Sequence, residues 1–115
     1  MTRALAMLLS ALWPLGSAHQ RPRWPRPMRR AVASWYDDAG TTASGWHAFY
    51  GLANRSLRFG TRVRVCWPLG SRRCVTATVD DRGPYVPGRT FDLNQNLAGA
   101  LGFSGVATVR YRIGR

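Results

Sequence analysis

The sequence contains no glutamate and no lysine: its five acidic residues are all aspartate and its 17 basic residues are all arginine. Any carboxylate chemistry must therefore come from aspartate. Two of the five, Asp81 and Asp92, flank one loop that is stiffened by Pro84 and Pro87. The missing lysine reflects either the base composition of the genome or a use of arginine for bidentate contacts. The net charge of +12 favours an anionic partner.

Long apolar segments are also lacking. The apolar run at 4–15 is shorter than the roughly 20 residues that span a bilayer. It follows Arg3 and precedes the small residues Gly16 and Ala18, a pattern typical of a signal peptide at 1–18. No cysteine lies near this point to carry a lipid anchor. We expect a secreted, periplasmic or cell-envelope protein without a lipid anchor; the alternative is an N-terminal helix buried in the fold.

Residues 19–30 read "HQRPRWPRPMRR" and hold five arginines and three prolines. Proline-rich segments favour extended conformations and do not bury a core, so we interpret 19–30 as a basic linker before a domain at 31–115. It either binds anionic wall polymers or a membrane surface, or is a solvated spacer. Nucleic acid fits the charge, but a signal peptide argues against it, so we expect no nucleic-acid partner.

Cysteine is scarce, and the two that are present fall in alternating segments at 62–67 and 74–79. A hairpin centred on Gly70 places Cys66 opposite Cys74 and Val65 opposite Val75, with both cysteines on the outer, polar face. In a secreted chain this arrangement predicts a disulfide, the alternative being two free buried thiols. The five aspartates and two histidines show no metal-ligand spacing, so we expect neither a metal nor another cofactor.

Four further segments complete the expected fold. Residues 31–36 and 89–92 read as short strands, and Asp80 reads as a turn or surface residue. Asn94 suits a helix N-cap, and Gly102 suits the helix end. The expected inward positions are Leu97, Ala100 and Leu101 on the helix, and Ala107, Val109, Tyr111 and Ile113 on a last strand at 107–113. Short strands with one helix predict a mainly β chain, a compact barrel.

Several motifs occur in an order that resembles a known family. They are "ASWY" at 33–36, "TASG" at 42–45, "LRFGTRV" at 57–63, "DRGPYVPGR" at 81–89, "FDLN" at 91–94 and "ALGFSGVATV" at 100–109. Together they resemble the rare lipoprotein A (RlpA) family over residues 31–113. The resemblance implies a six-stranded double-psi β-barrel with one short helix, a fold shared with expansins and barwin-like proteins.

The resemblance also implies a groove that holds peptidoglycan glycan strands. Some members are lytic transglycosylases, lyases in which the muramyl 6-hydroxyl is the internal nucleophile, so one acid/base group suffices. Asp81 matches the aspartate of "DRGP", and Asp92 matches that of "DL". We expect these two as catalytic residues, with Asp81 favoured as the acid. Their alternative role is hydrogen bonding to backbone amides of the loop.

The sequence departs from the enzymatic pattern at two positions. Trp46 stands where many relatives have glutamate, and Asn54 where they have histidine. His47 is a possible substitute for the lost polar group. Aromatic rings suit the apolar faces of sugars, with ordinary packing as the alternative. The expected substrate-binding residues are Trp46, His47, Tyr50, Asn54, Arg82 and Tyr85.

Three classes of function remain open. The first is a peptidoglycan lytic transglycosylase. The second, favoured by the two departures, is a non-catalytic wall-binding module, because expansin-like members bind polysaccharide without measurable cleavage. The third is a basic protein whose segment 19–30 binds an anionic polymer or membrane, with the barrel as scaffold. In each case we expect a monomer.

Overall fold

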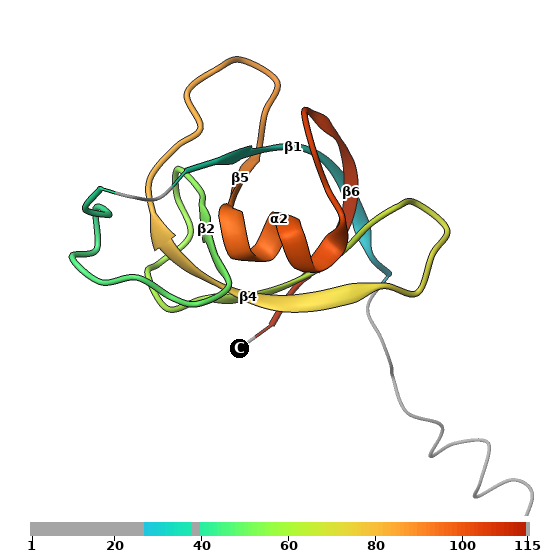
Figure 1. Ribbon diagram of the computed structural model, residues 1–115, viewed down its shortest axis with the longest axis horizontal. Coiled ribbons are helices and arrows are strands. Elements are labelled where there is room, and N and C mark those ends of the chain that lie inside the picture. Colours follow the sequence, from blue (N-terminus) through green and yellow to red (C-terminus); the bar gives the residue numbers. More distant parts are fainter. Residues whose placement is uncertain (1–26, 38–39, 115) are drawn as a thin grey trace, which may run out of the picture.

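Six strands close into a barrel in the computed structural model, which describes residues 27–37 and 40–114 (Figure 1). The predicted signal peptide and most of the predicted basic linker lie outside the described residues. The elements, in chain order, are β1 (Arg29–Tyr36), β2 (Gly51–Ala53), β3 (Arg62–Cys66), β4 (Cys74–Asp81), β5 (Phe91–Asn94), α2 (Gln95–Leu101) and β6 (Ala107–Ile113). This architecture confirms the predicted mainly β fold with one short helix.

The order of strands around the barrel is β1-β5-β2-β4-β3-β6. β1 pairs with β5 and β2 with β4 in parallel, and the other neighbours are antiparallel. Strand β2 has only three residues and was not expected from the sequence. β5 begins at Phe91 rather than Arg89, and β4 continues beyond Val79 to Asp81.

The barrel encloses an apolar core built by alternation along the strands. Val63 and Val65 of β3 and Ala77 and Val79 of β4 are fully buried, while Arg62 and Arg64 are exposed. Side chains two residues apart point to the same face of a strand, so this alternation directs the apolar residues inward. Larger side chains fill the remaining interior, among them Phe91, Leu52, Leu93, Leu97, Leu101 and Val109.

Helix α2 packs against β1, β2, β4 and β5 near the centre of the view in Figure 1. Asn94 caps it as predicted, since its side chain accepts a hydrogen bond from the Leu97 amide. Gly102 ends it with a left-handed φ of 70°. The expected inward position of Ala100 was wrong. Leu97, Ala98 and Leu101 are buried, so the buried face includes Ala98 in place of Ala100, which is exposed.

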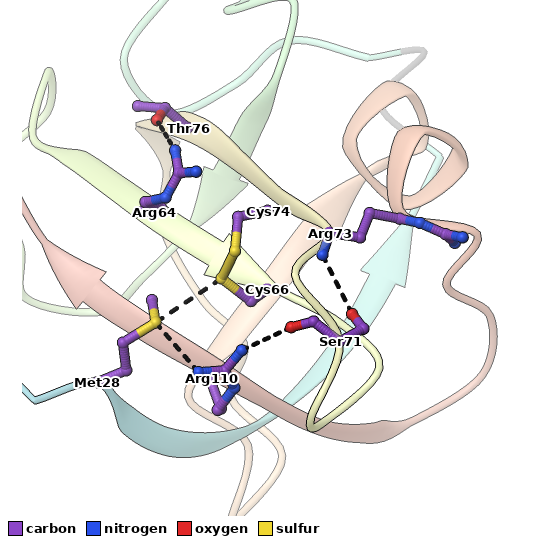
Figure 2. The surroundings of a disulfide bond; sticks show 8 residues. All are labelled: Met28, Arg64, Cys66, Ser71, Arg73, Cys74, Thr76 and Arg110. Atoms are coloured by element: carbon purple, nitrogen blue, oxygen red, sulfur yellow. Dashed lines mark hydrogen bonds between the residues drawn. A yellow bond between two sulfur atoms is a disulfide. The ribbon is translucent and has the colours of Figure 1, made fainter.

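The β3–β4 hairpin has the predicted register, with Cys66 opposite Cys74 and Val65 opposite Val75. The two cysteines form a disulfide, also as predicted (Figure 2). Cys66 follows the inward-facing Val65 and so points to the outer face, as expected, but it is fully buried there. Its outer side is covered by Met28, whose Sδ lies 3.7 Å from the Cys66 Sγ.

Strand β6 has the predicted bounds, but its inward face is less regular than expected. Val109 is fully buried and Tyr111 packs partly against the core. Ile113 is 45% exposed, because it lies at the end of the strand, so the inward position expected for it was wrong. In the part of the chain that the structure describes, we find no helix with the length and apolar character needed to cross a membrane.

Candidate functional site

Four residues form a row across four neighbouring strands. Ser34 of β1 pairs with Asp92 of β5, and Asp92 pairs with Ala53 of β2. Ala53 in turn pairs with Asp81 of β4. Directly paired residues point to the same face of a sheet, so the two aspartates share one face with the small Ala53 between them. We call Ser34, Asp92, Ala53 and Asp81 the acidic row.

The acidic row lies on the outer face of the barrel. The neighbouring cross-strand row consists of Leu93, Leu52 and Val79, which are fully buried in the core. Because consecutive residues of a strand alternate in direction, Asp92 and Ala53 point away from that core. Two strand spacings separate Asp81 from Asp92, which places their backbones about 10 Å apart. Ala53 is itself buried, with 2% of its surface exposed, so the partly exposed members of the row are Asp81 and Asp92.

Asp92 is half-buried, and its carboxylate accepts a 2.8 Å hydrogen bond from the Ser34 hydroxyl. Burial raises the pKa of Asp92 above its ordinary value of 3.8. The Ser34 hydrogen bond and the charge of Arg89 lower that pKa, while the charge of Asp81 raises it further. Asp92 therefore holds its proton to a higher pH than an ordinary aspartate does, which suits a general acid.

Asp81 has a different environment, in which its Oδ1 accepts hydrogen bonds of 2.8 Å from two backbone amides. One amide belongs to Ala43 and the other to Arg82. The bond to Ala43 ties the segment at 40–50 to the end of β4. Asp81 thus has the loop-bracing role that the sequence left open, and its position in the acidic row also lets it act on Asp92 through its charge.

Asp80 is fully buried, so the expectation of a turn or surface residue was wrong. The pairing of β2 with β4 shifts register between Leu52 and Ala53, and Asp80 is the additional residue at this bulge. Its Oδ2 accepts a 2.8 Å hydrogen bond from the Ala48 amide. Asp80 and Asp81 together therefore hold the segment at 40–50 against the end of β4.

The guanidinium of Arg82 is directed toward the turn at 54–59. Its Nη1 donates to the carbonyl oxygens of Asn54 at 3.1 Å and Leu57 at 2.8 Å. The same group lies 3.8 Å from the centre of the Phe59 ring, a cation–π contact. These contacts brace the turn, and a substrate-binding role for Arg82 stays a prediction.

Asn54 is nearly buried, with 8% of its surface exposed. Its Oδ1 accepts from the amides of Ser56 and Leu57 at 3.0 and 2.8 Å, and its Nδ2 donates to the Thr90 carbonyl at 3.1 Å. Asn54 thus joins the turn after β2 to the residue before β5. Its expected contact with substrate stays a prediction.

Arg55 has a position that the sequence analysis missed. Its Nη1 donates to the carbonyl oxygens of Pro84 at 2.8 Å and Arg89 at 2.9 Å. These two carbonyls lie on the two sides of the loop at 82–90, so one guanidinium holds the base of the loop together. No sequence motif marked this residue, because the contact joins segments that are 29 and 34 residues apart.

The expected aromatic residues divide into exposed and packed side chains. Trp46 is 42% exposed and Tyr85 is 74% exposed. They belong to the loops at 40–50 and 82–90, which project on the side of β2 and β5 in Figure 1. Tyr50 packs partly against the core, with the Phe49 ring 4.8 Å away. Phe49 itself is 69% exposed and was not predicted as a site residue.

His47 is exposed in the same segment as Trp46, so the structure places it among the projecting side chains. Within residues 27–37 and 40–114, no group of three or more histidine, cysteine or acidic side chains is arranged to hold a metal ion. The chemistry available in the acidic row is therefore that of the two aspartates and the Ser34 hydroxyl.

Comparisons with a family model, with related sequences and with solved structures agree with one another. A family model described as lytic transglycolase matches residues 28–111. A relative from Nostoc sp. is 48% identical over 63 residues, covering 53% of this chain and 17% of the relative. A second, from Synechocystis sp., is 36% identical over 90 residues, covering 71% of this chain and 28% of the relative.

A third relative, from Aquifex aeolicus, is 44% identical over 80 residues, covering 64% of this chain and 34% of the relative. All three carry the name probable endolytic peptidoglycan transglycosylase RlpA. The matched part of this chain thus corresponds to about a third or less of each relative's length.

Among solved structures, the Streptomyces papain inhibitor matches with a TM-score of 0.60 and 17% identity, covering 78% of this chain and 96% of the inhibitor. That likeness shows the fold alone.

Proposed function

The chain belongs to the RlpA-like double-psi β-barrel family, and on that premise we propose that it cleaves peptidoglycan glycan strands as a lytic transglycosylase. The names of the three relatives support peptidoglycan as the substrate. The observation that carries the proposal is the acidic row, in which a carboxyl group with a raised pKa lies on the same face as a second carboxylate. We place its action in the cell envelope, which the names of the relatives and the signal-like pattern at 1–18 support.

We assign the acid to Asp92 rather than to Asp81, toward which the sequence motif pointed. A general acid must be protonated when the glycosidic bond breaks, and Asp92 has the raised pKa. Asp81 is already engaged by two backbone amides, and its charge helps to keep the proton on Asp92. Asp81 therefore acts as a positioning residue, and Ser34 orients the acid through its hydrogen bond.

The reaction needs one proton donor and no water. Asp92 gives its proton to the glycosidic oxygen as the bond from that oxygen to the muramyl C1 breaks. The 6-hydroxyl of the same sugar forms the new bond to C1, and its proton passes to the Asp92 carboxylate. The acid is regenerated, and the product is a 1,6-anhydro sugar end.

The test is incubation of the purified protein with glycan strands, both peptide-free and peptide-bearing, followed by mass analysis of the products. We expect chain ends that are lighter by one water than the products of hydrolysis. Asp92→Asn abolishes them, because an amide does not deliver the proton. Asp81→Asn weakens activity and shifts its pH dependence. Asp37→Asn, an exposed residue outside the acidic row, has the same change in charge and serves as the control.

A second candidate is a non-catalytic module that binds wall polysaccharide. It is favoured by Trp46 and Asn54 at the two positions where enzymatic relatives differ, and by the exposed rings of Phe49 and Tyr85. Stacking on sugar rings needs such exposed aromatic faces. If the unmodified protein binds the strands and releases no anhydro ends, this second function replaces the first.

A further inference from the structure

Arginines face one another across the β3–β6 pair. Arg64 of β3 is the direct cross-strand partner of Arg112 of β6. Arg62, two residues before Arg64, lies on the same face of β3. Arg62 and Arg64 are exposed, and Arg112 is half-exposed. Side chains that are directly opposite each other lie close together, so this pairing makes the surface strongly basic.

Arginine is the only charged residue type on these two strands. β3 reads "RVRVC" and β6 reads "ATVRYRI", so neither contains an acidic residue. On the other side of β3, Arg64 pairs with Thr76 and Arg62 with Thr78, both uncharged. The acidic residues of β4 are Asp80 and Asp81 at its far end, where they hold the segment at 40–50.

These arginines surround a depression in the surface. A hollow of about 240 Å³ is lined by Arg62, Arg64, Thr76, Arg112 and Gly114, and we call it the arginine hollow. The Nη1 of Arg64 donates to the Thr76 hydroxyl at 3.4 Å, and Figure 2 shows the two side chains next to each other. Three arginines and one threonine thus line a space large enough for a small anion.

We propose that the arginine hollow binds the phosphate groups of a phosphodiester polymer, such as an anionic polymer of the cell wall. Guanidinium groups bind phosphate oxygens with two parallel hydrogen bonds, and three arginines line the hollow. Arg62 and Arg64 lie about 6.7 Å apart along the strand, so successive phosphates of one chain can each meet an arginine. A concave site suits an inserted polymer chain better than a flat membrane.

The arginine hollow lies away from Asp92. In the closed barrel, β3 is three strands from β5 in either direction, and β6 is likewise three strands from β2. An anionic polymer on β3 and β6 therefore lies away from Asp92 of β5, while Asp81 lies at the end of β4, beyond Thr76 and Thr78. The proposal is independent of the proposed glycan cleavage, because it concerns other residues and another ligand.

The test is titration of the purified protein with inorganic polyphosphate at several salt concentrations. We expect Arg64→Gln to lower the affinity on the order of tenfold, because it removes a charge-assisted contact. It should also reduce the slope of log affinity against log salt by about one. The matched control is Arg72→Gln, which removes one exposed arginine from the β3–β4 hairpin. It is expected to leave both quantities unchanged, and since both variants keep residues 19–30, the basic linker contributes equally.

Titrations with three further ligands distinguish a phosphodiester polymer from other anionic partners. Polyglutamate of similar charge should bind more weakly than polyphosphate, and anionic phospholipid vesicles and single-stranded DNA should show no dependence on Arg64. Equal loss in Arg64→Gln and Arg72→Gln would show a general charge effect and overturn the proposal. Polyglutamate binding as tightly as polyphosphate would also overturn it. Arg64-dependent binding that is strongest for vesicles or for DNA would replace the polymer with a membrane or a nucleic acid.

Discussion

Ser34 donates a 2.8 Å hydrogen bond to the Asp92 carboxylate across the parallel pair of β1 and β5. The bond lowers the pKa of Asp92 and opposes the effect of burial. Ser34→Ala should therefore raise the pKa of Asp92 further, and it should cost about 0.5–1.5 kcal/mol of stability. Titration of the Asp92 carboxyl followed by NMR measures the first effect, and thermal unfolding measures the second.

The control for this prediction is Ser34→Thr, which keeps the hydroxyl. Its Asp92 pKa should stay close to that of the unmodified protein. If glycan cleavage is measurable, the pH at which the cleavage rate falls on the alkaline side should be higher in Ser34→Ala than in the unmodified protein. It should be unchanged in Ser34→Thr. An Asp92 pKa that is unchanged in Ser34→Ala would contradict the positioning role of Ser34.

The raised pKa of Asp92 predicts how stability depends on pH. The folded protein holds the Asp92 proton above pH 3.8, where the unfolded chain loses it. Its contribution to stability is therefore greatest below that pH and falls as pH rises through the folded-state pKa. Asp92→Asn removes this dependence, so the variant should gain stability relative to the unmodified protein between about pH 3 and pH 7.

Thermal unfolding of both proteins across that range measures the difference. Asp37→Asn, at an exposed position, corrects for the change in net charge. A variant whose stability relative to the unmodified protein falls as pH rises would mean that the native site favours the Asp92 carboxylate over the acid.

Gly51 is packed against the buried Asp80 side chain. A Cβ at position 51 would lie 2.5 Å from the Asp80 Oδ2, closer than real side chains approach. Gly51→Ala should therefore destabilise the protein by about 1–3 kcal/mol, the usual cost of overpacking. Denaturant unfolding measures it. Gly99→Ala is the matched control, because nothing lies within 4 Å of a Cβ there, and alanine favours the helix. Equal stability of the two variants would contradict the close packing at Gly51.

The disulfide between Cys66 and Cys74 closes a short loop, with a sequence separation of 8. In the loop-entropy estimate such a ring stabilises the folded state by about 2–3 kcal/mol. Replacing both cysteines with serine should lower the free energy of unfolding by this amount or more, because Cys66 is fully buried. Unfolding in denaturant checks the value, and intact-mass measurement of the non-reduced protein checks the bond. Finding both thiols reduced in folded protein would contradict it.

The strands that could be predicted from the sequence are those with clear alternation. The register of Cys66 with Cys74 followed from the placement of Gly70, and the bounds of β6 followed from its apolar and polar pattern. Strand β2 was missed because three residues are too few to show a period. Asp80 was misread because the segment at 40–50 packs over it and buries it, a contact that no local pattern shows.

The site was predictable only in part, for a related reason. The motifs around Asp81 and Asp92 marked the two aspartates as candidates. Ser34 and Ala53 became part of the site through cross-strand pairing, between residues that are far apart in the sequence. Such pairing depends on the closed barrel order, which no local pattern encodes. The same holds for Arg55, whose partners lie beyond the next two strands.

The contact of Arg55 with Pro84 and Arg89 divides the loop at 82–90 into two parts. The base is fixed by one guanidinium, while the tip, residues 85–88, is exposed. Substitutions at the tip therefore leave the backbone that carries the aspartates in place. In evolution and in protein engineering alike, the tip is therefore a segment whose sequence can be exchanged while the backbone at Asp81 and Asp92 keeps its position.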